Sequence, residues 1–265
     1  MHADSNSEGR TQRPSQRLYL LYHELRSAGS RYSYVTGAEM FEKHANIYAQ
    51  LRTAADGSFL WPELTFDDGH ISNLQIALPI LQLHKLTARF FITVGWTGIK
   101  PGYMGWDALR SLHQAGQSIG AHGWTHTLLT HCTDRELEKE LVAARTTLED
   151  KLGIPITTMS LPGGRYNSRV LNACKQAGYT QVYTSIPKAE TLPPGATVGR
   201  LNIRGDMQPD WIAQLFAPGS KLLQSIQHQY RRKEALKKLL GDRLYAKLWA
   251  FINRQETEAG EDAAA

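Results

Sequence analysis

Two adjacent carboxylates and two imidazoles four residues apart are the groups in this sequence best suited to chemistry. The sequence Thr-Phe-Asp-Asp-Gly puts Asp67 and Asp68 side by side. Because adjacent acids repel each other, the pair is stabilised if one binds a cation and the other acts as a base. The sequence His-Gly-Trp-Thr-His supplies His122 and His126, close enough on one helical turn to hold a single ion. Two imidazoles and one carboxylate are typical of an open catalytic metal site.

Each motif also has an interpretation without chemistry. Adjacent aspartates can cap a helix in a surface loop. Two histidines in this spacing can be surface or capping residues. The joint occurrence of the two motifs, each at the end of an expected strand, favours the metal site over these alternatives.

The elements that must position these groups follow a βα rhythm between residues 17 and 204, where short apolar runs alternate with longer helical patterns. The expected strands are 18–22, 63–66, 88–94, 118–121, 157–161, 181–184 and 198–203. The expected helices are 38–54, 72–84, 106–115, 134–152 and 168–177. Parallel strands joined by helices close into a barrel or form an open sheet.

In both of these architectures the chemistry collects at the carboxyl ends of the strands. Polar side chains follow four of the expected strands. They are His23, the Asp67-Asp68 pair, His122 and Ser185. We therefore expect these groups to share one site.

Composition limits the class of protein. Hydrophobic residues make up 42% and charged residues 21% of the 265-residue chain, which is ordinary for a globular protein with a full core. No apolar run is long enough to span a membrane. Residues 1–17 are polar and are expected to be a disordered lead-in rather than a secretory signal. Cys132 and Cys174 form no disulfide framework pattern. A cytoplasmic location is the resulting expectation.

The net charge of +5 comes from one segment. Residues 221–254 hold nine Lys or Arg against Glu234 and Asp242. Leucines recur there at helical spacing, which predicts a basic amphipathic helix that packs on residues 18–220 or, alternatively, contacts a membrane surface. No nucleic-acid motif accompanies the charge. The acidic, alanine-rich residues 255–265 are expected to be a disordered tail.

The Asp-Asp and His-x-x-x-His motifs together resemble the first two motifs of the polysaccharide deacetylases with a NodB-homology domain (carbohydrate esterase family 4-like). The resemblance covers about residues 18–203. It implies a distorted (β/α)7 barrel and a hydrolase that removes an N-acyl group from an amino sugar in a glycan or glycan precursor. It also implies Asp67 as general base and Asp68, His122 and His126 as ligands of a divalent metal, expected to be Zn²⁺.

The third motif of that family, Arg-x-Pro-Tyr-Gly, is only partly matched. Ser160 stands where the arginine that orients the base would be, and Arg165 and Arg200 are candidates to replace it. Main-chain N–H groups of this segment could bind an oxyanion. The candidate substrate and oxyanion residues are Pro162, Gly163, Gly164, Arg165 and Tyr166.

The fourth and fifth family motifs are missing from their usual places. The pair Asp210-Trp211 fits a helix start better than the fourth motif. No histidine-bearing strand closes the domain, but residues 18–22 form a strand-like run that ends in His23. This run resembles the fifth motif moved to the amino end of the chain, as in circularly permuted members of the family. The resemblance implies that strand 18–22 lies beside strand 198–203 and that His23 is the general acid. The alternative is a structural histidine at a strand edge.

The expected reaction is hydrolysis of an amide. The metal lowers the pKa of water, Asp67 accepts its proton, and His23 protonates the departing amine. One rival is a hydrolase of another non-peptide C–N bond. A second is an inactive glycan-binding module of the same fold, which the missing motifs would suit. The intact base and three intact ligands argue against it.

Overall fold

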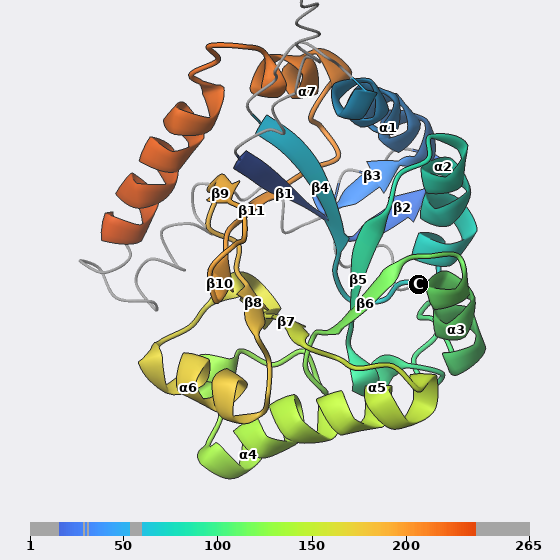
Figure 1. The fold of residues 1–265 in the computed structure, drawn as a ribbon, viewed down its shortest axis with the longest axis vertical. Coiled ribbons are helices and arrows are strands. Elements are labelled where there is room, and N and C mark those ends of the chain that lie inside the picture. The colour runs from blue at the N-terminus through green and yellow to red at the C-terminus, as the bar shows by residue number, and fades with distance from the viewer. Residues whose placement is uncertain (1–15, 29, 31, 54–59, 237–265) are drawn as a thin grey trace, which may run out of the picture.

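A predominantly parallel sheet curls into a nearly closed barrel, with helices packed around its outside (Figure 1). The computed structural model describes residues 16–28, 30, 32–53 and 60–236. The barrel strands are β1 (Gln16–Tyr22), β4 (Leu60–Phe66), β5 (Ala88–Ile92), β6 (Ser118–Ala121), β7 (Thr158–Ser160), β8 (Gln181–Tyr183), β9 (Glu190–Thr191), β10 (Thr197–Val198) and β11 (Arg200–Asn202). Their order is β10-β8-β7-β6-β5-β4-β1-β11, with β9 antiparallel to β1. A separate parallel pair joins β2 (Glu24–Arg26) to β3 (Val35–Gly37).

The helices confirm the expected βα rhythm. They are α1 (Ala38–Thr53), α2 (Leu78–Leu83), α3 (Trp106–Gln114), α4 (Asp134–Glu138), α5 (Ala144–Leu152), α6 (Ser168–Gln176) and α7 (Pro209–Phe216). Two π-helical segments, Asn73–Ala77 and Lys139–Ala143, lie within the expected helices 72–84 and 134–152. Thr133 caps α4 through a capping box with Glu136.

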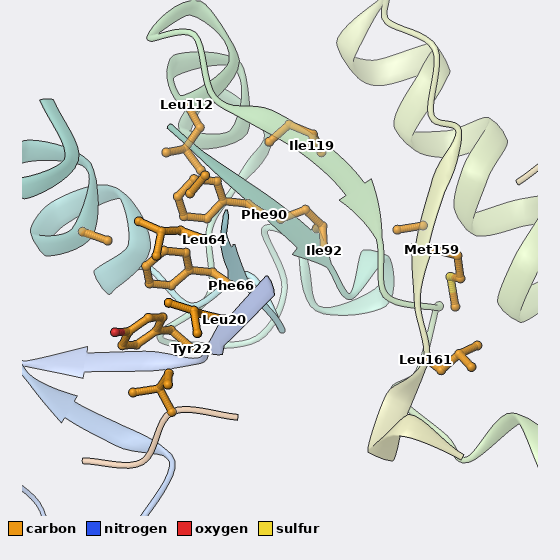
Figure 2. Packing of buried hydrophobic residues seen from close by; sticks show 14 of the residues in the cluster. Leu20, Tyr22, Leu64, Phe66, Phe90, Ile92, Leu112, Ile119, Met159 and Leu161 are labelled. Atoms are coloured by element: carbon orange, nitrogen blue, oxygen red, sulfur yellow. The ribbon is translucent and has the colours of Figure 1, made fainter. Parts of the chain in front are cut away.

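The main core lies between the sheet and the helices. Phe66 of β4 stacks on Phe90 of β5 with ring centroids 4.9 Å apart (Figure 2). Successive side chains of a strand point to opposite faces, so the residues next to these point into the barrel. There Phe91 and Tyr183 form a small second cluster beside the buried Arg200. This alternation brings Thr65 and Asp67 of the β4 end onto the inner face.

In place of the single expected strand 198–203, the structure has two short strands, β10 and β11, which lie at the two ends of the strand order. β10 pairs with β8, while β11 pairs with β1 at the other end of the strand order. Gly199 lies between them, and a Cβ there would come 2.6 Å from the Ile186 carbonyl oxygen. Only a residue without a side chain permits this close crossing. The expected neighbourhood of strands 18–22 and 198–203 is confirmed, with Tyr19 in register with Arg200.

The two ends of the described chain differ in detail from expectation. β1 begins at Gln16, inside the expected lead-in, and residues 1–15 lie outside the described residues. Residues 222–236 are helical, and Leu222, Leu223 and Ile226 pack against the main core. The rest of the expected basic segment and the tail, 237–265, lie outside the described residues. Within the described part of the chain, no helix is both long and apolar enough to cross a membrane.

Candidate active site

A cavity of about 400 Å³ opens where the barrel strands end. Its wall includes His23 after β1, Asp67 and Asp68 after β4, and His122 and His126 after β6. Ser185, which follows β8, also lines it. The structure therefore brings together the polar groups that the sequence placed at separate strand ends.

Asp68, His122 and His126 form a three-residue cluster suited to a metal ion. Asp68 Oδ1 lies 3.3 Å from the Nε2 atoms of both histidines, and the candidate ligand atoms all lie within 4.8 Å of one another. Asp68 Oδ1 is buried and has no hydrogen-bond partner among the described residues. His122 Nδ1 donates to the Ser160 carbonyl at 2.8 Å, which leaves Nε2 with its lone pair toward the cluster. One carboxylate and two such imidazoles fit a divalent cation.

The electrostatics of the cluster agree with this fit. Burial alone would raise the pKa of Asp68, but the two adjacent imidazoles outweigh burial and hold the pKa well below its ordinary value. Burial likewise works against a charged His122, but the Asp67 and Asp68 carboxylates outweigh it and raise the pKa of His122. The pocket therefore favours positive charge beside Asp68. A bound cation would supply that charge in place of the imidazole proton.

The segment from His122 to His126 is a bent loop, so the interpretation of a helical turn is wrong. Gly123 has φ 77° and His126 has φ 64°, both in the left-handed region. Asp68, with φ 74°, is in the same region. Side chains other than glycine rarely adopt this conformation, and such residues gather at functional sites. Two of the three candidate ligands are thus aimed by unusual backbone geometry.

Glu140, which the sequence did not single out, holds this loop in place. Its buried carboxylate accepts the Trp124 N–H at 2.7 Å and the Thr125 N–H at 3.0 Å. Glu140 belongs to the π-helical segment Lys139–Ala143, and such segments are frequent at functional sites. In a sequence, a buried acid within a predicted amphipathic helix looks the same as an acid exposed to solvent. The sequence therefore gave no signal that could identify Glu140.

Asp67 is buried and held by groups from two other strands. Arg200 of β11 donates from Nη1 to Oδ1 at 2.7 Å and from Nη2 to Oδ2 at 2.8 Å. Ser160 Oγ donates to Oδ2 at 2.8 Å. Burial would raise the pKa of Asp67, but Arg200 and His122 together outweigh it and lower the pKa. Asp67 is therefore ionised, as a base must be. Of the two candidates to replace the missing arginine, Arg200 makes this contact.

His23 lies at the same cavity, with its ring edge-to-face against Tyr34 at 5.2 Å. The buried Asn73 side chain donates to the His23 carbonyl at 2.8 Å and fixes the backbone. Nδ1 of His23 is buried without a partner among the described residues. Burial lowers the pKa of His23, and the nearby Asp67 and Asp68 carboxylates oppose this only in part. His23 is neutral at pH 7 and a stronger acid than an exposed histidine.

The predicted oxyanion segment reaches the cavity through one of its five residues. Gly163 lines the cavity, whereas Pro162, Gly164, Arg165 and Tyr166 do not. The Gly164 N–H donates to the Leu161 carbonyl at 2.8 Å, so it is not available to an oxyanion. The segment turns tightly as a 3₁₀-helix, with Gly163 and Gly164 both at positive φ, and its role toward substrate or an oxyanion stays a prediction.

Aromatic side chains that the sequence did not assign surround the cavity mouth. Tyr32 and Tyr34 come from the loop between β2 and β3 and are 61% and 41% exposed. Tyr103 lies on the cavity wall against His70, with ring centroids 5.6 Å apart. Trp96 contacts the His126 ring at 5.1 Å. His70 also lines the cavity and is therefore part of the candidate site.

Comparison with known proteins agrees with this fold. The family model described as polysaccharide deacetylase matches residues 62–182. YxkH of Bacillus subtilis, whose name assigns it to the same group, is 26% identical over 204 residues, which cover 72% of each chain. The peptidoglycan-N-acetylglucosamine deacetylase PgdA of Listeria monocytogenes is 32% identical over 108 residues, which cover 40% of this chain and 22% of that protein.

Solved structures give the same fold. The Streptococcus pyogenes deacetylase PplD, in complex with acetate, has a TM-score of 0.67 at 19% identity and covers 78% of this chain and 100% of its own. IcaB from Ammonifex degensii has a TM-score of 0.64 at 22% identity and covers 77% and 98%. Residues 62–182 therefore resemble the polysaccharide deacetylases, as the sequence motifs indicated. The distorted α/β barrel is confirmed, whereas circular permutation stays a prediction.

Proposed function

We propose that the protein removes acetyl groups from the amino sugars of a glycan, in a reaction that requires a divalent metal. The observation that carries this proposal is the convergence of Asp67, Asp68, His122, His126 and His23 on one cavity. Of these residues, Asp68, His122 and His126 would hold the metal. Zn²⁺ suits a set of two imidazoles and one carboxylate. The ion would supply polarisation of the amide carbonyl and a lower pKa for water.

The protein's own residues divide the proton transfers between them. Asp67, ionised and held by Arg200, accepts a proton from the attacking water. His23 lies at the same cavity and, in its protonated imidazolium form, delivers a proton to the departing amine and returns to the neutral ring. Because His23 has a lowered pKa, it gives up a proton readily once it carries one. The remaining main-chain N–H groups near Gly163 are the candidates to bind the oxyanion.

The cavity mouth favours a glycan over another amide. Tyr32 and Tyr34 expose ring surface beside the site, and aromatic rings with a hydroxyl at one end suit ligands that are part apolar and part polar. A pyranose ring has this character, with C–H groups on its faces and hydroxyls around its edge. PgdA and PplD, which this chain resembles, are named as deacetylases. Their names support acetyl as the acyl group.

The test combines metal analysis with product release. The purified protein is stripped with a chelator, reloaded with Zn²⁺ and incubated with N-acetylated chito-oligosaccharides, and acetate is measured. We expect one tightly held ion per chain and acetate release only from the loaded protein. Asp68→Ala is the matched inactive control. Glycan binding without acetate release would favour the inactive module instead. Hydrolysis confined to other amides would favour the rival hydrolase.

A further inference from the structure

An arginine on β11 occupies the position beside Asp67 that the family resemblance assigns to an arginine at position 160. Ser160 stands there instead, on β7, and its side chain is fully buried. Both strands border the interior of the barrel, so a guanidinium can approach Asp67 from either side. The smaller serine leaves the room that the Arg200 side chain fills.

All three guanidinium nitrogens of Arg200 are engaged. Beyond the fork to Asp67, Nη2 donates to Ser160 Oγ at 2.7 Å and Nε donates to the Thr184 carbonyl at 3.0 Å. Nη1 also lies 3.3 Å from Thr65 Oγ1. The side chain is 0% exposed. The planar guanidinium is held in one orientation because each of its nitrogens donates a hydrogen bond. Since two of these nitrogens bind the two oxygens of Asp67, the carboxylate is held in one orientation too.

We propose that Arg200 is the positioning residue for the base Asp67, with Ser160 as its partner, and that this pair replaces the single arginine of the family's third motif. The inference rests on the proposed function. Arg200 and Ser160 make three hydrogen bonds to a carboxylate that can accept about four, which leaves capacity for one proton. The pair thereby fixes the base without blocking it.

With the arginine on β11 instead of β7, the two groups that depart from the family pattern, Arg200 and His23, come from neighbouring strands. Arg200 is in register with Tyr19 of β1, the strand that ends before His23. Both Arg200 and His23 lie outside residues 62–182, the stretch that the family model matches. The ligands and the base belong to the matched stretch. The group that orients the base and the candidate acid both come from the β1–β11 pair.

Four variants test the role of Arg200. Arg200→Lys keeps the charge but loses the fork, and we expect kcat to fall about 100-fold with KM and metal content unchanged. Ser160→Ala removes one bond to Asp67, and we expect a kcat loss of roughly tenfold. The double variant Ser160→Arg with Arg200→Ser returns the guanidinium to β7 and should exceed Arg200→Ser alone in kcat by at least about tenfold. Arg89→Lys changes another barrel arginine, which contacts Thr158 rather than Asp67, and is the matched control.

The outcomes separate positioning from packing. A role confined to packing predicts a lower melting temperature but wild-type kcat in the folded Arg200→Lys protein, and that result would overturn the proposal. Loss of metal together with activity in the same variant would also overturn it. Should the double variant not fold, Arg200→Lys and Ser160→Ala decide the question. Crystal structures of the metal-free variants give a readout independent of turnover, since the Asp67 carboxylate should rotate in Arg200→Lys. Acetate release by the wild type tests the proposed function separately.

Discussion

Thr125 Oγ1 donates a hydrogen bond of 2.6 Å to Glu140 Oε1, and this contact ties the loop between the two candidate histidine ligands to a π-helical segment of the barrel's outer layer. The same carboxylate accepts the Thr125 and Trp124 N–H groups. A Cβ on Gly123 would come 2.8 Å from Glu140 Oε2, so the loop and the acid are closely fitted. The spacing between His122 and His126 therefore depends on a residue that touches neither.

Glu140→Gln should weaken metal binding while leaving all three ligands in place. The neutral amide is a weaker acceptor than the carboxylate, so the charge-assisted bonds that hold the Trp124 and Thr125 N–H groups become weaker. Groups that orient metal ligands typically contribute 10–100-fold in affinity, and we expect a loss of about that size. Competition with a chelator of known affinity measures it. Glu138→Gln, an exposed acid two residues away, is the control and should bind metal as the wild type does.

Substitutions of Asp67 and of His126 should have opposite effects on the metal content of the purified protein. His126→Ala should lose most bound metal and nearly all activity and stay folded, because the side chain is 35% exposed and lies outside the main core. Asp67→Asn should keep its metal and lose activity by roughly 10²–10⁴-fold, the range for a lost general base. Metal retained by His126→Ala would overturn the assignment of His126 as a ligand. Metal lost by Asp67→Asn would show that base and ligand have been assigned the wrong way round.

His23 should set the fall of activity at high pH. A group that donates a proton must be protonated, so activity declines as pH rises through its pKa. Burial lowers the pKa of His23 below the ordinary value of 6.5, so the decline in kcat/KM should occur below that pH. His23→Ala should keep the metal, lose rate, and lose less on substrates with a leaving group that needs no proton. A pH–rate profile of the variant with an unchanged falling limb would exclude His23 as the acid.

His44 should make the fold sensitive to acid independently of the active site. Its Nε2 donates to the Met207 carbonyl and its Nδ1 accepts from the Tyr22 hydroxyl, so the buried ring is neutral. Burial lowers its pKa to about 4. The unfolded chain therefore binds a proton more readily, and stability present above pH 6.5 is lost as pH falls toward 4, by up to roughly 3 kcal/mol.

Chemical unfolding of the metal-free protein across this pH range measures the effect. His44→Gln should be less stable at pH 7 but should lose less stability on acidification than the wild type. His113→Gln, which changes an exposed histidine of α3, serves as the control and should follow the wild type. An equally steep loss in His44→Gln would assign the acid sensitivity to other groups.

The amino-acid sequence by itself determined the βα rhythm and the residues of the candidate metal cluster. Apolar runs placed strands near 63–66 and 118–121, and the structure has β4 and β6 there. Acids and imidazoles that follow such runs must meet, because parallel strands end at one face of the barrel. These inferences needed only periodicity and residue type.

Only the tertiary structure decided what surrounds those groups. Arg200 and Asp67 are far apart in the chain, and their contact exists because the chain crosses at Gly199 so that β11 pairs with β1. Glu140 reaches the ligand loop because a π-helical segment turns it inward, and Tyr32 reaches the cavity mouth on a loop without periodicity. Sequence patterns report which face of an element is buried. They do not report which distant side chain fills the space opposite, since packing among all the elements sets that contact.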